Sequence, residues 1–181
     1  MARWVPPANV EANEQIGRRL FDEPLLAGSA GQPSFSGLLL THFEETRGDD
    51  FSVDRLGKSG LDKKVIFYLK PRAEAAGKLF TKTKRFDGWA VISAREITKN
   101  RKRAGFKIVA CPVNDPVPND NLYHAHICRP ADVEPEYMAL RLRHLFTTYG
   151  KIEAVAPPDI NAHWWDGIST ILQRFIRIFG L

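Results

Sequence analysis

Three apolar segments in the middle of the chain follow one another without a helical link. They are residues 89–97, 106–113 and 122–128. The first two are joined by a charged loop that ends in a glycine, and the last two by a connection containing Pro116 and Pro118. Two consecutive strands that pair in parallel need a long crossover connection, which these short links do not provide. The pattern therefore predicts a β-hairpin followed by a third strand, and hence an antiparallel sheet.

Helical patterns flank this predicted sheet. Residues 10–21 predict a short helix that a proline ends, and residues 71–80 begin with a proline and have an alanine-rich interior. Residues 134–149 repeat apolar side chains at helical spacing before a glycine. Compact apolar runs at 38–43 and 65–69 predict further strands. The expected fold class is α+β, an antiparallel sheet with helices mainly on one face.

The C-terminal segment carries a separate signal. After two prolines, residues 161–179 place their large apolar side chains on one stripe, which predicts an amphipathic helix. We expect this helix to dock on the protein's own sheet, to mediate contact with a protein partner or a second copy, or to lie on a lipid surface, in that order of preference. The expected organisation is an N-terminal lead-in and short helix over residues 1–30, a core domain over 31–150, and this C-terminal element over 151–181. The stripe consists of Trp164, Ile168, Ile171, Leu172, Phe175 and Phe179.

Length and cysteine content limit the class of protein. A chain of 181 residues can bury a core without disulfides or metals. Its two cysteines, Cys111 and Cys128, form no disulfide framework or zinc-ribbon spacing, which is typical of a reducing compartment. The first residues do not resemble a signal peptide, and no run of 18 apolar residues occurs. We therefore expect a cytoplasmic protein with no transmembrane span and no cofactor.

Positive charge is concentrated in the middle of the chain. Residues 58–107 hold 15 of the 26 Lys and Arg but only 4 of the 21 Asp and Glu. Such segregation predicts a positive face that attracts phosphate or an acidic protein surface. Aromatic residues stand among the basic clusters, as they do where bases stack and neighbouring cations hold phosphates. The predicted anion-binding residues are Lys82, Lys84, Arg85, Lys99, Arg101, Lys102, Arg103 and Lys107.

The strongest chemical candidate is the segment 121–128. In a strand, residues two apart share a face, so His124 and His126 would present two imidazoles side by side. They could begin a metal site or supply a general base, but a zinc site needs a third protein ligand. The preferred interpretation has one imidazole bonded to neighbouring groups and the other facing water. No metal is predicted.

A family resemblance covers residues 33–128. The strings Pro33-Ser-Phe-Ser36, Ser52-Val-Asp-Arg55, Asp115-Pro116 and Asn121-Leu-Tyr-His124-Ala125 resemble those of a group of small uncharacterised bacterial proteins. That group pairs an SVDR-like string with a later Asn-x-x-His-Ala string. The resemblance implies a compact cytoplasmic domain in which Ser52, Asp54, Arg55 and His124 lie near each other.

Two functions follow from these patterns. The first is a non-enzymatic binding or adaptor subunit of a bacterial assembly, whose basic surface holds nucleic acid or an acidic protein. The alternative is a small hydrolase or transferase acting on a nucleotide or nucleic acid. There His124 or His126 is the base, Asp54 orients it beside Ser52, and Arg55 clamps an anion. A cleft containing these groups would favour the enzyme, and a scattered arrangement the adaptor.

Overall fold

The computed structural model describes residues 5–21, 43, 50–81, 86–99 and 106–154. These residues form six strands and three helices, which confirms the α+β class. The strands are β1 (Glu14–Phe21), β2 (Asp50–Lys58), β3 (Phe86–Ser93), β4 (Lys107–Ala110), β5 (His124–Cys128) and β6 (Lys151–Ala154). The helices are α1 (Lys63–Thr81), α2 (Ala94–Thr98) and α4 (Pro135–Tyr149).

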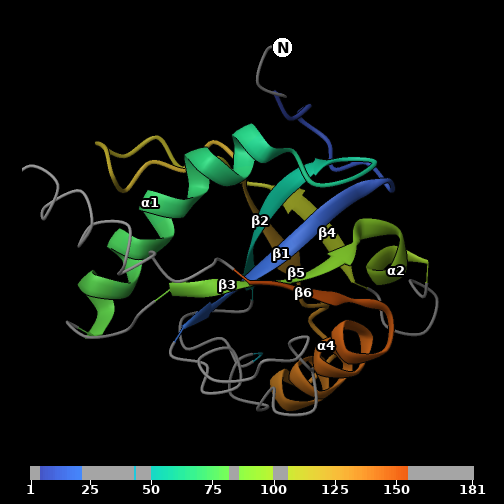
Figure 1. Ribbon diagram of the computed structural model, residues 1–181. Helices are drawn as coiled ribbons and strands as arrows, with labels where there is room; N and C mark the ends of the chain where they lie inside the picture. The colour runs from blue at the N-terminus through green and yellow to red at the C-terminus, as the bar shows by residue number, and fades with distance from the viewer. Residues whose placement is uncertain (1–4, 22–42, 44–49, 82–85, 100–105, 155–181) are drawn as a thin grey trace, which may run out of the picture.

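The six strands make one antiparallel sheet in the order β4-β5-β2-β1-β3-β6. Figure 1 shows α1 and α4 on opposite sides of this sheet. β1 and β6 lie outside the range 31–150 expected for the core domain, and both belong to the sheet. No helix within the described ranges is long and apolar enough to cross a membrane.

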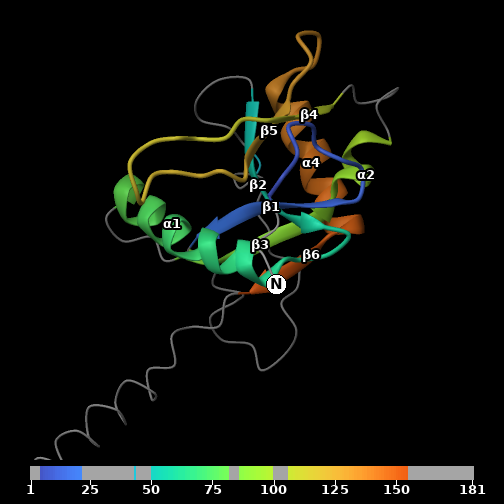
Figure 2. The same cartoon turned by 90° about the horizontal axis from the view of Figure 1, so that it is seen from above.

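Each face of the sheet has its own hydrophobic core. On one face, α2 and α4 bury side chains such as Ile97, Leu142 and Phe146 against β1, β2, β3 and β5. On the other face, Val65, Leu69 and Ala73 of α1 pack with a smaller group of sheet residues. Figure 2 shows the sheet and the helices α1 and α4 from above. We call the second face the α1 face; its sheet residues include Leu56, Trp89, Val91 and Tyr123.

Two helical crossovers explain this arrangement. β2 and β3 are both antiparallel to β1, so they run parallel to each other and need the crossover that α1 supplies. β5 and β6 are likewise parallel, and α4 connects them on the opposite face. α1 therefore covers one face of the sheet, while α4 completes the core on the other.

The predicted helix over residues 10–21 is wrong, because residues 14–21 form β1. Ile16 and Leu20 are four apart, a spacing that fits one face of a helix and also one face of a strand. The strand places both in the core beside α4, and Gly17 faces Leu56 and Trp89. The local sequence fits a helix or a strand, and pairing of β1 with β2 and β3 makes it a strand.

The predicted strand over 65–69 is also wrong, because these residues form the first half of α1. Val65, Leu69 and Ala73 recur every four residues and make one buried stripe, which the apolar run concealed. Asp62 caps this helix: its Oδ1 accepts from the amides of Lys64 and Val65 at 2.8 and 3.4 Å. Pro71 therefore lies inside the helix and does not start it.

The predicted hairpin between residues 89–97 and 106–113 does not form. α2 interrupts it, beginning at the N-cap Ser93, and β3 and β4 lie far apart in the strand order. β4 pairs with β5, which is the third of the predicted strands, and this pairing is antiparallel. The predicted helix over 134–149 is confirmed as α4. The predicted C-terminal helix over 161–179, and all of the predicted strand 38–43 except Phe43, lie outside the described residues.

Candidate functional site

The pairing of β2 with β5 brings the predicted chemical residues together in two cross-strand pairs. Asp54 lies opposite His124, and Ser52 lies opposite His126. Directly opposed residues share a face, so all four lie on the α1 face. The neighbourhood of Ser52, Asp54 and His124 implied by the resemblance is therefore present in the structure.

Asp54 is the centre of this cluster and is almost fully buried. Its carboxylate accepts four hydrogen bonds: Arg19 donates from Nε at 2.7 Å and from Nη2 at 2.9 Å. Trp89 Nε1 and Asn121 Nδ2 each donate at 2.8 Å. The four donors come from β1, β3 and the connection before β5. A carboxylate with this set of partners is an anchor that fixes three surrounding segments, and it orients Arg19.

The ionisation of Asp54 follows from these partners. Burial alone would raise the pKa of the carboxyl, but the charge of Arg19 and the hydrogen bonds from Arg19, Trp89 and Asn121 lower the pKa below its ordinary value of 3.8. Asp54 is therefore a carboxylate at neutral pH.

His124 has a defined tautomer. Its Nδ1 lies 3.0 Å from the carbonyl oxygen of Cys111, and a carbonyl can only accept, so Nδ1 carries the proton. Nε2 then presents a lone pair. Burial lowers the pKa of His124 below 6.5, against the raising effects of the Cys111 carbonyl and Asp54. The imidazole is thus neutral at pH 7 and has the form of a general base.

His126 lies against His124 and an acidic group. The two rings contact edge to face, with 4.7 Å between centroids. Asp50 Oδ2 lies 3.5 Å from His126 Nδ1 and can pair with the imidazole when it carries a second proton. The side chain of His126 is 28% exposed, so a ligand can reach it. The two histidines therefore differ in their partners: His124 bonds a backbone carbonyl, and His126 lies beside the carboxylate of Asp50.

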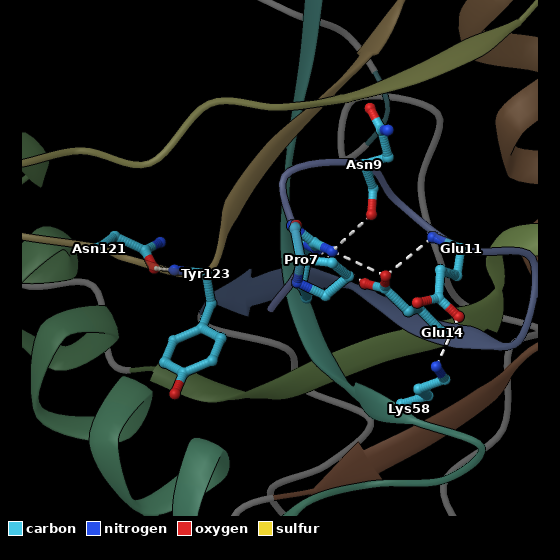
Figure 3. Close-up of polar contacts among 8 residues, drawn as sticks. Pro7, Asn9, Glu11, Glu14, Lys58, Asn121 and Tyr123 are labelled. Atoms are coloured by element: carbon cyan, nitrogen blue, oxygen red, sulfur yellow. Dashed lines mark hydrogen bonds and ion pairs between the residues drawn. The ribbon is translucent and has the colours of Figure 1, made fainter. Parts of the chain in front are cut away.

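Arg55 does not lie with the other predicted residues. It points to the opposite face, where Glu14 Oε2 accepts from Nε and Oε1 from Nη2, both at 2.7 Å. Its guanidinium also donates to the carbonyls of Pro7 and Asn9. Figure 3 shows Glu14, Pro7 and Asn9 with Glu11, whose amide donates to Glu14. Arg55 and Glu14 are buried, so this ion pair ties the N-terminal lead-in to the sheet.

Two consecutive residues join this cluster to α1. Asn121 bonds Asp54, and its side-chain oxygen accepts from the amide of Tyr123 at 3.0 Å (Figure 3). The preceding Asp120 accepts from Tyr68 Oη at 2.6 Å and from Arg72 at 2.7 Å. The hydrogen bond from Arg72 lowers the pKa of Asp120. The connection between β4 and β5 is thus fastened to both the helix and the sheet.

The side of α1 that faces away from the sheet carries a basic and aromatic surface. We call it the outer face of α1, formed by Lys63, Lys64, Phe67, Lys70 and Pro71. These positions fall on one side of a helix with 3.6 residues per turn, and Glu74 follows them. Phe67 is 83% exposed. An open depression of about 470 Å³ lies here, lined by Lys63, Lys64, Phe67, Tyr68, Pro71 and Arg72.

The predicted anion-binding residues are only partly described. Lys99 contacts Glu96 at 2.5 Å and lies over the ring of Tyr149, with 5.0 Å to its centroid. Lys107 is exposed at the start of β4. The remaining six lie outside the described residues: Lys82, Lys84, Arg85, Arg101, Lys102 and Arg103.

The described part of the chain contains no group of three His, Cys, Asp or Glu side chains arranged to hold a metal ion. Its two cysteines are unpaired with each other. Burial, with the nearby Asp50, raises the pKa of Cys128 to about 11, so this thiol stays protonated at neutral pH.

The sequence patterns missed Arg19, Trp89 and Asn121. Asn121 stands in the Asn-x-x-His-Ala string, which could have indicated it. Arg19 and Trp89 are brought to Asp54 only by the strand order, which no local pattern shows.

A scan against family models and searches of curated proteins and of solved structures each returned no match.

Proposed function

We propose that the protein is a binding subunit that holds single-stranded nucleic acid on the outer face of α1. The observation that carries the proposal is the exposed Phe67 ring among Lys63, Lys64 and Lys70. Unpaired bases stack on exposed aromatic rings, and lysines hold the phosphates between them. A base stacked on an aromatic side chain contributes roughly 1–3 kcal/mol, independently of sequence.

The first turn of α1 supports this proposal. It contains Lys63 and Lys64, both exposed, and no acidic residue. The capping carboxylate of Asp62 is held by the amides of Lys64 and Val65. The two lysines lie one helical turn before Phe67, where they can hold phosphates next to a stacked base.

An acidic protein surface is the other partner that basic residues could attract. Lysines alone would serve either partner equally. The exposed phenylalanine favours nucleic acid, because a ring surrounded by ammonium groups matches alternating bases and phosphates. Arg55 lies on the opposite face of the sheet from Asp54, so it cannot act as the anion clamp beside Asp54 that the alternative function requires.

A salt titration of binding tests this proposal. The affinity for a fluorescent single-stranded oligonucleotide of mixed sequence should fall with salt, with a log-log slope of about 0.7 per phosphate neutralised. Lys63→Ser with Lys64→Ser should flatten this slope by roughly 1.4, and Phe67→Ala should weaken binding about tenfold or more while leaving the slope unchanged.

Lys151→Ser, on the edge strand β6, is the matched control and should bind as the wild type does. An unchanged affinity in both outer-face variants would refute the proposal. Binding to an acidic protein with no affinity for oligonucleotides would refute it as well.

A further inference from the structure

Arg19, His124 and His126 form a second candidate site, on the α1 face of the sheet, that the proposed binding role does not use. We infer that these three residues cleave RNA, transferring the phosphodiester to the ribose 2′-hydroxyl. The choice of a nucleic acid substrate rests on the proposed function. The chemistry rests on the geometry of the cluster alone. We call these three residues the sheet site.

His124 is the general base of this reaction. Because Nδ1 donates to the Cys111 carbonyl, Nε2 holds a lone pair that can take a proton from a hydroxyl group. The same hydrogen bond fixes the plane of the ring, so the base does not have to be oriented during the reaction. A neutral imidazole at physiological pH is the form that such a step requires.

His126 is the general acid. It lies two residues along the same strand, so the two Cα atoms are about 6.6 Å apart. Asp50, 3.5 Å from Nδ1, can pair with the protonated ring, whose Nε2–H is then the proton donor. The ring centroids are 4.7 Å apart, so the two imidazoles are close enough to act on one phosphodiester group.

Arg19 is the cation that holds the phosphate. Asp54 binds it through Nε and Nη2, and these bonds occupy two of the five guanidinium N–H donors. Trp89 and Asn121 hold Asp54 in turn, so the guanidinium is fixed before a ligand arrives. The side chain of Arg19 is 21% exposed. A preorganised cation of this kind stabilises negative charge that develops on the phosphoryl oxygens.

The reaction requires no nucleophile from the protein. His124 removes the proton from the 2′-hydroxyl, and the 2′-oxygen forms a bond to phosphorus. The bond from phosphorus to the 5′-oxygen breaks, and His126 protonates that oxygen. The products are a 2′,3′-cyclic phosphate and a free 5′-hydroxyl. Proton exchange with water returns both histidines to their starting states. DNA lacks the 2′-hydroxyl and is not a substrate.

A cleavage assay tests this inference without the outer face of α1. The substrate is a ribodinucleotide, too short to depend on Phe67, and the control substrates are the matching deoxyribonucleotide and the 2′-O-methyl form. The wild type should convert only the ribose form, and mass spectrometry should find the cyclic phosphate. His124→Asn and His126→Asn should each lower the rate about 100-fold or more, the contribution of a general acid or base.

His144 is an exposed histidine on α4. The His144→Asn variant, purified in parallel, is the control against contaminating nucleases and should keep the wild-type rate. The dinucleotide assay and the oligonucleotide titration are separate measurements, so a failure of binding on α1 and a failure of cleavage are told apart. Equal rates in the wild type and in both histidine variants would overturn the inference, as would an inactive wild type. His126 is partly exposed, so its variant remains informative if His124→Asn fails to fold.

Discussion

Asp54 determines the arrangement of side chains on the α1 face. Its buried carboxylate binds Arg19, Trp89 and Asn121, and it lies opposite His124. Each of these partners comes from a different segment, so one side chain fixes β1, β2, β3 and the approach to β5. A buried charge is costly unless every lone pair is satisfied, and here four donors satisfy it.

Replacing Asp54 with asparagine should therefore destabilise the fold. The amide nitrogen would face donors, and Arg19 would lose its partner, so the free energy of unfolding should fall by roughly 3–5 kcal/mol. Urea denaturation measures this change. Asp50→Asn is the control, because its half-exposed carboxylate should contribute no more than about 1 kcal/mol. Equal effects of the two substitutions would show that Asp54 is not the anchor.

The same carboxylate predicts an acid limit to stability. The folded-state pKa of Asp54 lies below 3.8, so its contribution is complete above pH 3.8 and is lost as the pH falls through the lower folded-state value. The difference in unfolding free energy between wild type and Asp54→Asn should therefore not shrink between pH 7 and pH 5, and should shrink only below pH 3.8. A difference that already shrinks above pH 5 would contradict this.

His124 predicts a second pH effect, in a different range. Its folded-state pKa lies below 6.5, although Asp54 faces it, because burial outweighs that charge, and His126 and Arg19 add to the lowering. The unfolded chain therefore binds more protons, and stability decreases as the pH falls from 6.5 toward the folded-state value. His124→Asn should remove this decrease. The measurement is urea denaturation at pH 5 and pH 7.5, and an identical slope in both proteins would exclude His124 as its source.

At the scale of elements, tertiary pairing decides the segments that local patterns leave ambiguous. The periodicity of α4 is clear because Met138, Leu142, Leu145 and Phe146 are all buried on one stripe. β5 is clear because its burial alternates. The predictions for β1 and for the first half of α1 are wrong, because a pair of apolar residues four apart fits one face of a helix and one face of a strand equally well. Ile16 and Leu20 form such a pair in β1, and Val65 and Leu69 form one in α1.

The candidate site shows the same limit. The strings around Asp54 and His124 indicated that these residues matter, and the resemblance implied that they are close. Their partners could not be predicted, because Arg19 reaches Asp54 only when β1 pairs with β2, and Trp89 only when β3 pairs with β1. Arg55, adjacent in the string, points to the other face, since neighbouring residues of a strand alternate.

The end of α4 gives a prediction at this scale. Gly150 follows the helix, as expected, and has φ −94°. The reason for glycine is close packing: an added Cβ would lie 2.5 Å from the Phe146 carbonyl oxygen and 2.7 Å from that of Val91. Gly150→Ala should force α4 away from β3 and lower the free energy of unfolding by about 1–3 kcal/mol. Thr148→Ala, exposed in the same turn, is the control in thermal denaturation, and equal melting temperatures would contradict this account.

At the scale of the whole molecule, the two crossover helices have different tasks. α4 buries a continuous apolar stripe and completes the larger core. α1 packs on the sheet through Val65, Leu69 and Ala73, which leaves the opposite side of the helix to lysines and Phe67. The fold therefore places the proposed nucleic acid surface on a rigid element, with Asp120 fastening that helix to the connection before β5.

Photo-crosslinking tests the proposed surface most directly. A single-stranded oligonucleotide carrying 5-bromouracil is irradiated with the full-length protein, and mass spectrometry maps the modified residues. The account predicts crosslinks to Phe67 and its neighbours on the outer face of α1, lost when Phe67 is replaced with alanine and competed by unlabelled single strands. Crosslinks confined to α4 or β6, or none at an oligonucleotide concentration that saturates binding, would contradict it.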